Sequence, residues 1–156
     1  MVPESTIETI IDRYDNEEEV YVNALAEIME NQPALLAFLN QESVDILLEE
    51  EKDILWYIIL VIYHSIEKSQ SEMVEVSDER LSENEEKNWE IFQDQQRGSF
   101  REKITPFFEK YREEDLLAFV EDTLELDDTS PMTAVGREVI FIAAKSVIDT
   151  LLPKMS

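Results

Sequence analysis

The run of residues from Ile54 to Ile66 is apolar on every face of a helix, and acidic residues stand on both sides of it. A helix with this pattern has to be enclosed by protein. The abundance of isoleucine and valine would also suit a strand. However, the run is longer than ordinary strands and contains no glycine or proline, so its length favours a helix. We therefore predict a buried central helix from about Glu51 to Ser69.

Apolar residues at helical spacing also mark the segments around this run. The stripe that starts at Ile7 is interrupted near Asp15. This pattern fits either one long helix with an acidic exposed turn or a helix that is broken or bent there, and we favour the break. Pro33 suits the first turn of a helix and predicts a second boundary. Ser5 and Ser99 are each followed by glutamate at the third position after them, the pattern of a capping box, so each is predicted to cap a helix.

The C-terminal part predicts helices over about 78–96, 100–111, 114–124 and 132–152, and the last of these is apolar on most faces. A length of 156 residues suggests one domain. Only two glycines occur, which disfavours a turn-rich all-β fold. We predict an all-α, single-domain helical bundle of six to eight helices, with Ile54–Ile66 and Val139–Leu152 buried in its middle.

A short motif occurs twice in the chain. Leu35–Leu39 recurs as Leu116–Val120, and each copy follows an amphipathic helix and precedes a very apolar one. With a gap of four residues, Asp53 matches Glu138 at the start of the two apolar helices. These matches suggest a weak internal repeat of residues 20–68 and 100–152, and thus two pseudo-repeated helical units. Four identities in five residues can also arise by chance in a leucine-rich helical chain, so both interpretations stay open.

The chain is strongly acidic, with 37 acids against 13 bases and a formal net charge of −24. This charge opposes binding to nucleic acid and to anionic membranes, and it favours a basic partner. The acidic run Glu49–Glu51 is predicted to be solvated at the start of the central helix, where it suits the helix dipole. There is no cysteine, no signal-peptide pattern and no apolar run of the ~20 residues that a membrane span needs. We therefore expect a cytoplasmic protein.

Few residues suggest chemistry. His64 and Glu67 share a helix face and are the candidate metal ligands. A di-iron bundle needs two Glu-x-x-His motifs and this chain has one histidine, so a histidine hydrogen-bonded near the helix end is the plainer interpretation. The acidic loop Asp127–Ser130 lacks the spacing and the glycine of an EF-hand. Since no phosphate-binding loop or nucleophile elbow occurs either, we predict no catalytic residue and no cofactor.

These observations favour a non-enzymatic interaction protein that binds a basic protein partner, as an inhibitor, an immunity-type protein or an assembly factor. The alternative is a helical bundle that binds a metal or small ligand through His64 and nearby carboxylates. A third interpretation is a homodimer whose interface covers one apolar helix.

Overall fold

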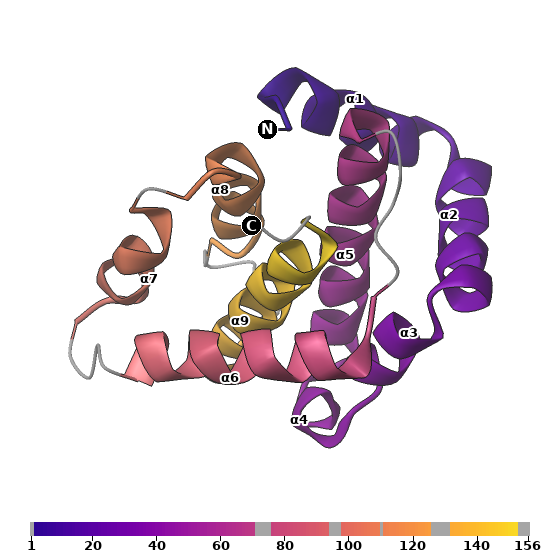
Figure 1. The fold of residues 1–156 in the computed structure, drawn as a ribbon. Coiled ribbons are helices and arrows are strands. Elements are labelled where there is room, and N and C mark those ends of the chain that lie inside the picture. The colour runs from indigo at the N-terminus through magenta and orange to yellow at the C-terminus, as the bar shows by residue number, and fades with distance from the viewer. Residues whose placement is uncertain (1, 71–75, 94–97, 110, 126–131, 153–156) are drawn as a thin grey trace.

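The computed structural model describes residues 2–70, 76–93, 98–109, 111–125 and 132–152, without the side chains of Glu42 and Ser43. All regular structure in these residues is helical. The helices are α1 (Glu4–Asn16), α2 (Glu18–Asn31), α3 (Pro33–Leu39), α4 (Glu42–Asp45), α5 (Glu49–Ser69), α6 (Asp78–Gln93), α7 (Phe100–Phe108), α8 (Glu114–Thr123) and α9 (Ala134–Leu151) (Figure 1). Apart from the single turn α4, the described part contains eight helices. This confirms the prediction of an all-α bundle of six to eight helices.

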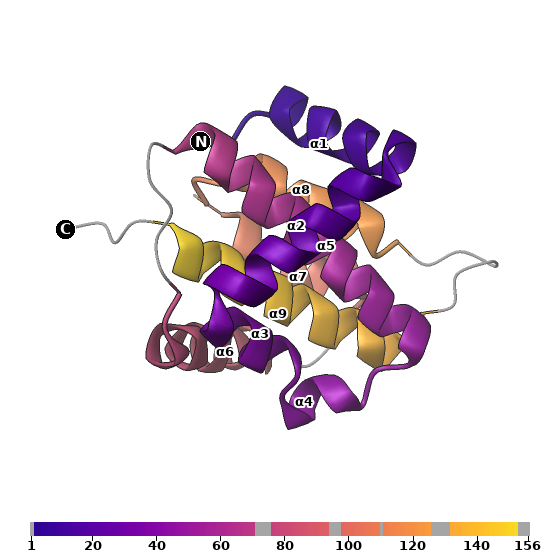
Figure 2. The same ribbon diagram turned by 90° about the vertical axis from the view of Figure 1, so that its right-hand side faces the viewer.

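Helices α5 and α9 pack against each other in the middle of the bundle (Figure 1, Figure 2). Helices α1 and α2 cover α5, α6 lies along α9, and α8 fills the space between α1, α5 and α9. Ile58–Ile62 and Ile140–Ile142 are completely buried, which confirms that the two apolar helices form the centre. Among the described residues, no helix is both long enough and apolar enough to cross a membrane.

The predicted helix boundaries largely agree with the structure. Helix α1 ends at Asn16 and α2 begins at Glu18, so the break near Asp15 is confirmed. Helix α3 begins at Pro33, as proline in the first turn predicts. The central helix α5 begins at Glu49, two residues before the expected position.

Of the two predicted caps, one is right and one is wrong. The Ser99 hydroxyl accepts a hydrogen bond from the backbone N–H of Glu102 at 3.2 Å and caps α7. Ser5 does not cap α1, because this helix begins at Glu4 with Pro3 as its N-cap. The carbonyl of Pro3, in extended conformation, accepts the first backbone hydrogen bonds of the helix. Ser5 therefore already lies inside the first turn.

One buried carboxylate links the N-terminal ends of both central helices. Glu51 is only 1% exposed, which corrects the expectation that it is solvated. Its carboxylate accepts hydrogen bonds from the N–H of Leu48 at 2.8 Å and from the N–H and the hydroxyl of Thr133, both at 2.9 Å. The Thr133 hydroxyl in turn accepts from the N–H of Gly136. Negative charge at two helix N-termini is favourable, so Glu51 stabilises the junction of α5 and α9.

Some packing contacts recur in the two halves of the chain. Helix α1 packs on α5 and on α8, and α6 packs on α9 and on α3. In the order of the suggested repeat, α3 precedes α5 as α8 precedes α9. Other contacts differ between the halves, since α2 packs on α3 and on α5 whereas α7 packs mainly on α6, so the internal repeat stays a prediction.

A polar network lies inside the C-terminal half, between α6, α9 and the residue Tyr111. The Lys145 ammonium lies 2.8 Å from the Asp149 carboxylate and 3.2 Å from the side-chain oxygen of Asn88. The Tyr111 hydroxyl donates to Asp149 at 2.6 Å, and the Lys145 ammonium lies over the Tyr111 ring. Burial, followed by the nearby Asp149 carboxylate, raises the pKa of Tyr111 far above its usual value. The fold therefore holds this phenol in its neutral form.

We expect the stability of the protein to fall when the pH rises above about 10, the usual pKa of tyrosine. Because folding raises the pKa of Tyr111, its contribution is fully present below pH ~10 and is lost progressively above it. Urea unfolding at several alkaline pH values measures this loss. In Tyr111→Phe the free energy of unfolding should fall less steeply with pH, by about 1.4 kcal/mol per pH unit, which is the effect of one proton. Equal slopes for the two proteins would contradict the expectation.

Candidate functional site

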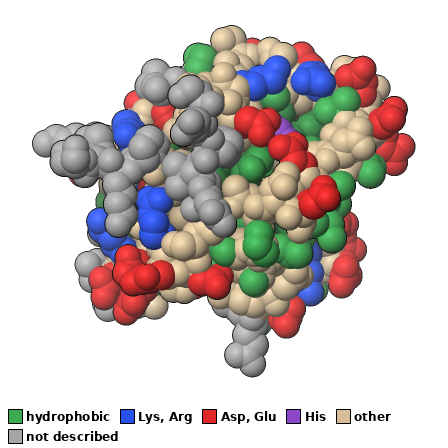
Figure 3. All heavy atoms as spheres, turned by 45° about the vertical axis from the view of Figure 1, so that its right-hand side comes forward, with side chains coloured by type: hydrophobic (Ala, Val, Ile, Leu, Met, Phe, Trp, Pro, Cys, Tyr) green, Lys and Arg blue, Asp and Glu red, His purple; other side chains and the backbone are tan. Residues whose placement is uncertain are grey.

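The single histidine lies where α1, α2 and α5 meet. The His64 side chain on α5 is 14% exposed, and its Nε2 atom lies 3.4 Å from the Glu27 carboxylate on α2. Glu67 lies one turn after His64 on α5, so that the two side chains share a helix face. Figure 3 shows the histidine at the surface beside acidic side chains. The two candidate metal ligands from the sequence, His64 and Glu67, thus lie side by side, and Glu27 of α2 is a third candidate ligand next to them.

Tyr14 on α1 holds the other side of the imidazole. Its hydroxyl lies 2.5 Å from His64 Nδ1 and 3.3 Å from the backbone carbonyl of Leu60. The Tyr14 side chain is buried, and burial raises the pKa of its phenol far above the usual value, with smaller effects from neighbouring groups. A neutral hydroxyl can accept from Nδ1–H while it donates to the carbonyl. Tyr14 therefore fixes the orientation of the ring.

The carboxyl groups of this site influence each other. The pKa of Glu67 is raised above its usual value, first because burial disfavours the charged form and second because the Glu27 carboxylate is near. His64 has the opposite effect on this pKa. The donor atoms of Glu27, His64 and Glu67 all lie within 4.8 Å of one another, close enough to hold one positive charge between them.

A pocket of about 250 Å³ opens onto this cluster. Its wall combines the apolar side chains of α1 and α2 with charged groups from α1, α2 and α5. The lining residues are Ile10, Arg13, Tyr14, Val20, Asn23, Ala24, Glu27, His64, Glu67 and Lys68. The pocket therefore gives solvent and small solutes access to the His64 side chain. The other acidic feature considered for cations, the loop Asp127–Ser130, lies outside the described residues.

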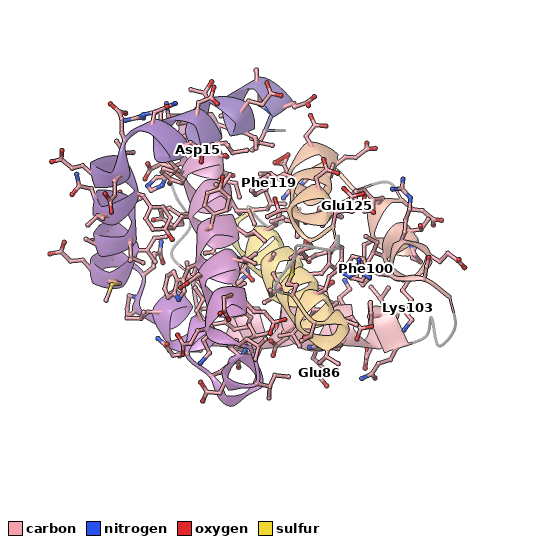
Figure 4. The ribbon with its side chains drawn as sticks, turned by 180° about the vertical axis from the view of Figure 1, so that it is seen from behind. Asp15, Glu86, Phe100, Lys103, Phe119 and Glu125 are labelled. Carbon is pink, nitrogen blue, oxygen red and sulfur yellow. The ribbon has the colours of Figure 1, made fainter. Side chains whose placement is uncertain are left out.

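A second and larger hollow lies between α1 and α8, which we call the α1–α8 groove. It has a volume of about 520 Å³ and is lined by Glu4, Ile7, Glu8, Ile11, Tyr57, Asp115, Ala118, Phe119, Asp122 and Thr123. Figure 4 shows Phe119 of α8 in the space between α8 and α5. The Phe119 ring packs on Tyr57 with a centroid distance of 6.4 Å.

The α1–α8 groove has an apolar floor and an acidic rim. Ile11, Tyr57 and Phe119 are half-buried and keep apolar surface accessible. Every charged residue that lines the groove is acidic, whereas Arg13 and Lys68 line the pocket at His64. This groove could not be predicted from the sequence, because α1 and α8 come together only through the fold. In the sequence, the one sign of the groove is that both helices carry an apolar stripe beside exposed acidic residues.

Comparisons with protein-family models, with curated proteins and with solved structures found no match for this chain.

Proposed function

We propose that this chain is a non-enzymatic interaction protein that binds a basic partner, and that a basic amphipathic helix of the partner docks in the α1–α8 groove. The observation that carries the proposal is the combination of an accessible apolar floor with a rim on which all charged groups are acidic. Inhibitors, immunity-type proteins and assembly factors are the classes of protein that work in this way.

The size of the groove suits one short helix. Its walls are the 13 residues of α1 and the 10 residues of α8, which correspond to roughly 15–20 Å at 1.5 Å per residue. A partner helix of similar length would place apolar anchors on the floor at Ile11 and Phe119. Its lysines and arginines would then face Glu8 and Asp122, which are exposed.

The charge of the whole chain supports fast association. With a net charge of −24, the protein attracts a basic partner over long distances and repels acidic molecules. Complementary charge raises the association rate and the specificity more than the affinity, and the buried apolar anchors then slow dissociation. Binding should therefore weaken as the salt concentration rises.

The test uses a fluorescently labelled, basic amphipathic peptide of about 14 residues and measures its anisotropy with the full chain. We expect the double variant Glu8→Gln/Asp122→Asn to bind about tenfold more weakly than the unchanged protein at low salt, a difference of about 1.4 kcal/mol. Phe119→Ser should also weaken binding, because it removes an apolar anchor from the floor. A scrambled peptide of the same composition should bind poorly.

The matched control is Glu83→Gln/Glu86→Gln on α6, which removes the same amount of charge from exposed positions outside the groove. Figure 4 shows Glu86 on α6, well away from Phe119. This variant should keep nearly full affinity for the peptide. If the two double variants lose the same affinity, the binding comes from overall charge and the groove is not the docking site.

A further inference from the structure

We infer that Glu27, His64 and Glu67 bind a divalent first-row transition-metal ion, with Tyr14 as a positioning residue behind the imidazole. This site is separate from the α1–α8 groove and does not depend on the function proposed for it. The three side chains come from α2 and α5, and the pocket of about 250 Å³ gives an ion access to them.

The donor atoms are already spaced for a small ion. Zinc holds nitrogen and oxygen ligands at roughly 2.0–2.2 Å, so two ligands at tetrahedral positions lie roughly 3.3–3.6 Å apart. The distance from His64 Nε2 to the Glu27 carboxylate oxygen is 3.4 Å. The third donor, from Glu67, lies within 4.8 Å of both. The half-buried Glu67 side chain can close this remaining distance by rotating about its own bonds.

The hydrogen bonds behind the ring favour a metal-binding tautomer of His64. A histidine that binds a metal through Nε2 normally donates its Nδ1–H to a polar group. Here Nδ1 faces the Tyr14 hydroxyl, which can itself donate to the carbonyl of Leu60. In this tautomer Nδ1–H donates to the hydroxyl, the hydroxyl donates to the carbonyl, and the Nε2 lone pair faces the Glu27 carboxylate. This arrangement also gives a role to a tyrosine hydroxyl placed in the core.

The charge balance of the site favours a cation. Glu27 and Glu67 are both part-buried, and two carboxylates at this distance repel each other unless a proton or an ion lies between them. Arg13 and Lys68 also line the pocket, but Arg13 pairs with Glu17 at 4.0 Å and Lys68 is exposed.

The other half of the chain offers a comparison. Counted along the helices from the matched residues Asp53 and Glu138, His64 corresponds to Asp149. Asp149 is neutralised inside the protein by the Lys145 ammonium at 2.8 Å. His64 and its two carboxylate neighbours instead face an open pocket, which an ion from solution can enter.

The donor set indicates which ions fit. Imidazole suits zinc, iron, nickel and copper, whereas carboxylates also suit manganese. One nitrogen and two carboxylate oxygens therefore favour zinc or manganese over calcium and magnesium, which prefer oxygen alone. The remaining coordination positions face the pocket, where water or a small ligand can bind.

Binding is tested by titrating the metal-free protein with zinc chloride in a calorimeter. We expect one zinc ion per chain, and about tenfold or greater loss of affinity in Glu27→Gln and in Glu67→Gln. Glu30→Gln, which removes the same charge from an exposed position on α2, is the matched control and should bind like the unchanged protein. Tyr14→Phe should weaken binding about 10- to 100-fold, the usual effect of losing such a partner.

The chain has a single histidine, so its imidazole resonances need no assignment. In protein labelled with ¹⁵N-histidine, zinc should shift the Nε2 resonance most, and Nδ1 should remain protonated. Equal zinc affinities for Glu30→Gln and Glu67→Gln would show binding to surface carboxylates in general and overturn the proposal. Imidazole resonances of the unchanged protein that do not respond to zinc would also overturn the proposal. This measurement needs no variant, so it holds even if one of the variants folds poorly.

Discussion

Gly136→Ala should destabilise the protein by about 2–4 kcal/mol, although alanine is the better helix former by about 1 kcal/mol. A Cβ at this position would overlap the carboxylate of Glu51. Glu51 cannot simply turn away, because it is buried and accepts three hydrogen bonds from Leu48 and Thr133. The new methyl group would displace a charged group that fixes the starts of α5 and α9. Urea unfolding followed by circular dichroism measures the change.

A double-mutant cycle identifies the cause of this loss. In a Glu51→Ala background the obstacle is gone, so Gly136→Ala should be neutral or stabilise by up to about 1 kcal/mol. Val135→Ala is the matched control, since Val135 is 58% exposed on the same turn and should change stability by less than about 0.5 kcal/mol. If Gly136→Ala cost the same with and without Glu51, the carboxylate would not be its cause.

Lys145→Met should cost about 3 kcal/mol, because it leaves the part-buried Asp149 carboxylate without its counter-charge. The ammonium is also lost from the faces of the Tyr111 and Phe107 rings. Adding Asp149→Asn should recover a large part of the loss. A neutral side chain at this position needs no counter-charge, and its amide oxygen can still accept from the Tyr111 hydroxyl. Urea unfolding of the two single variants and the double variant gives the coupling energy.

The comparison for this experiment is Lys52→Met. Lys52 pairs with Asp45 at 3.8 Å, but the Asp45 side chain is 67% exposed. A solvated pair of this kind contributes about 0–1 kcal/mol, so Lys52→Met should have a small effect. If Lys52→Met and Lys145→Met lowered the free energy of unfolding by similar amounts, burial would not explain the contribution of the Lys145–Asp149 pair to stability.

The fold could be predicted from the sequence because its main signal is local. A helix that is apolar on every face has to be central, and this alone located α5 and α9. The helix breaks near Asp15 and before Pro33 also follow from adjacent residues. The prediction that Ser5 caps α1 was wrong because Pro3, two residues earlier, is the N-cap instead. The prediction that Glu51 is solvated was wrong for a different reason. Its partner Thr133 is the N-cap of α9, far away in the sequence, so the run of glutamates alone gives no sign that Glu51 is buried.

The candidate site was predictable only in part for the same reason. His64 and Glu67 are neighbours on one helix face, and helical spacing identified them. Glu27 and Tyr14 reach the imidazole from α2 and α1, and nothing in their own sequence surroundings distinguishes them from other glutamates and tyrosines. The α1–α8 groove joins segments about a hundred residues apart. Such features depend on how the helices are arranged, which the apolar pattern does not specify.

The contact between α5 and α9 makes the halves of the chain depend on each other for folding. Each half contributes one helix that is apolar on nearly all faces, and each such helix covers part of the other. Residues 2–70 alone would leave the α9-facing side of α5 in water, and residues 76–152 would expose α9 in the same way. We therefore expect that neither half folds on its own, whatever its ancestry. Unfolding should be a single cooperative transition, in which damage near His64 and damage near Asp149 lower the same midpoint.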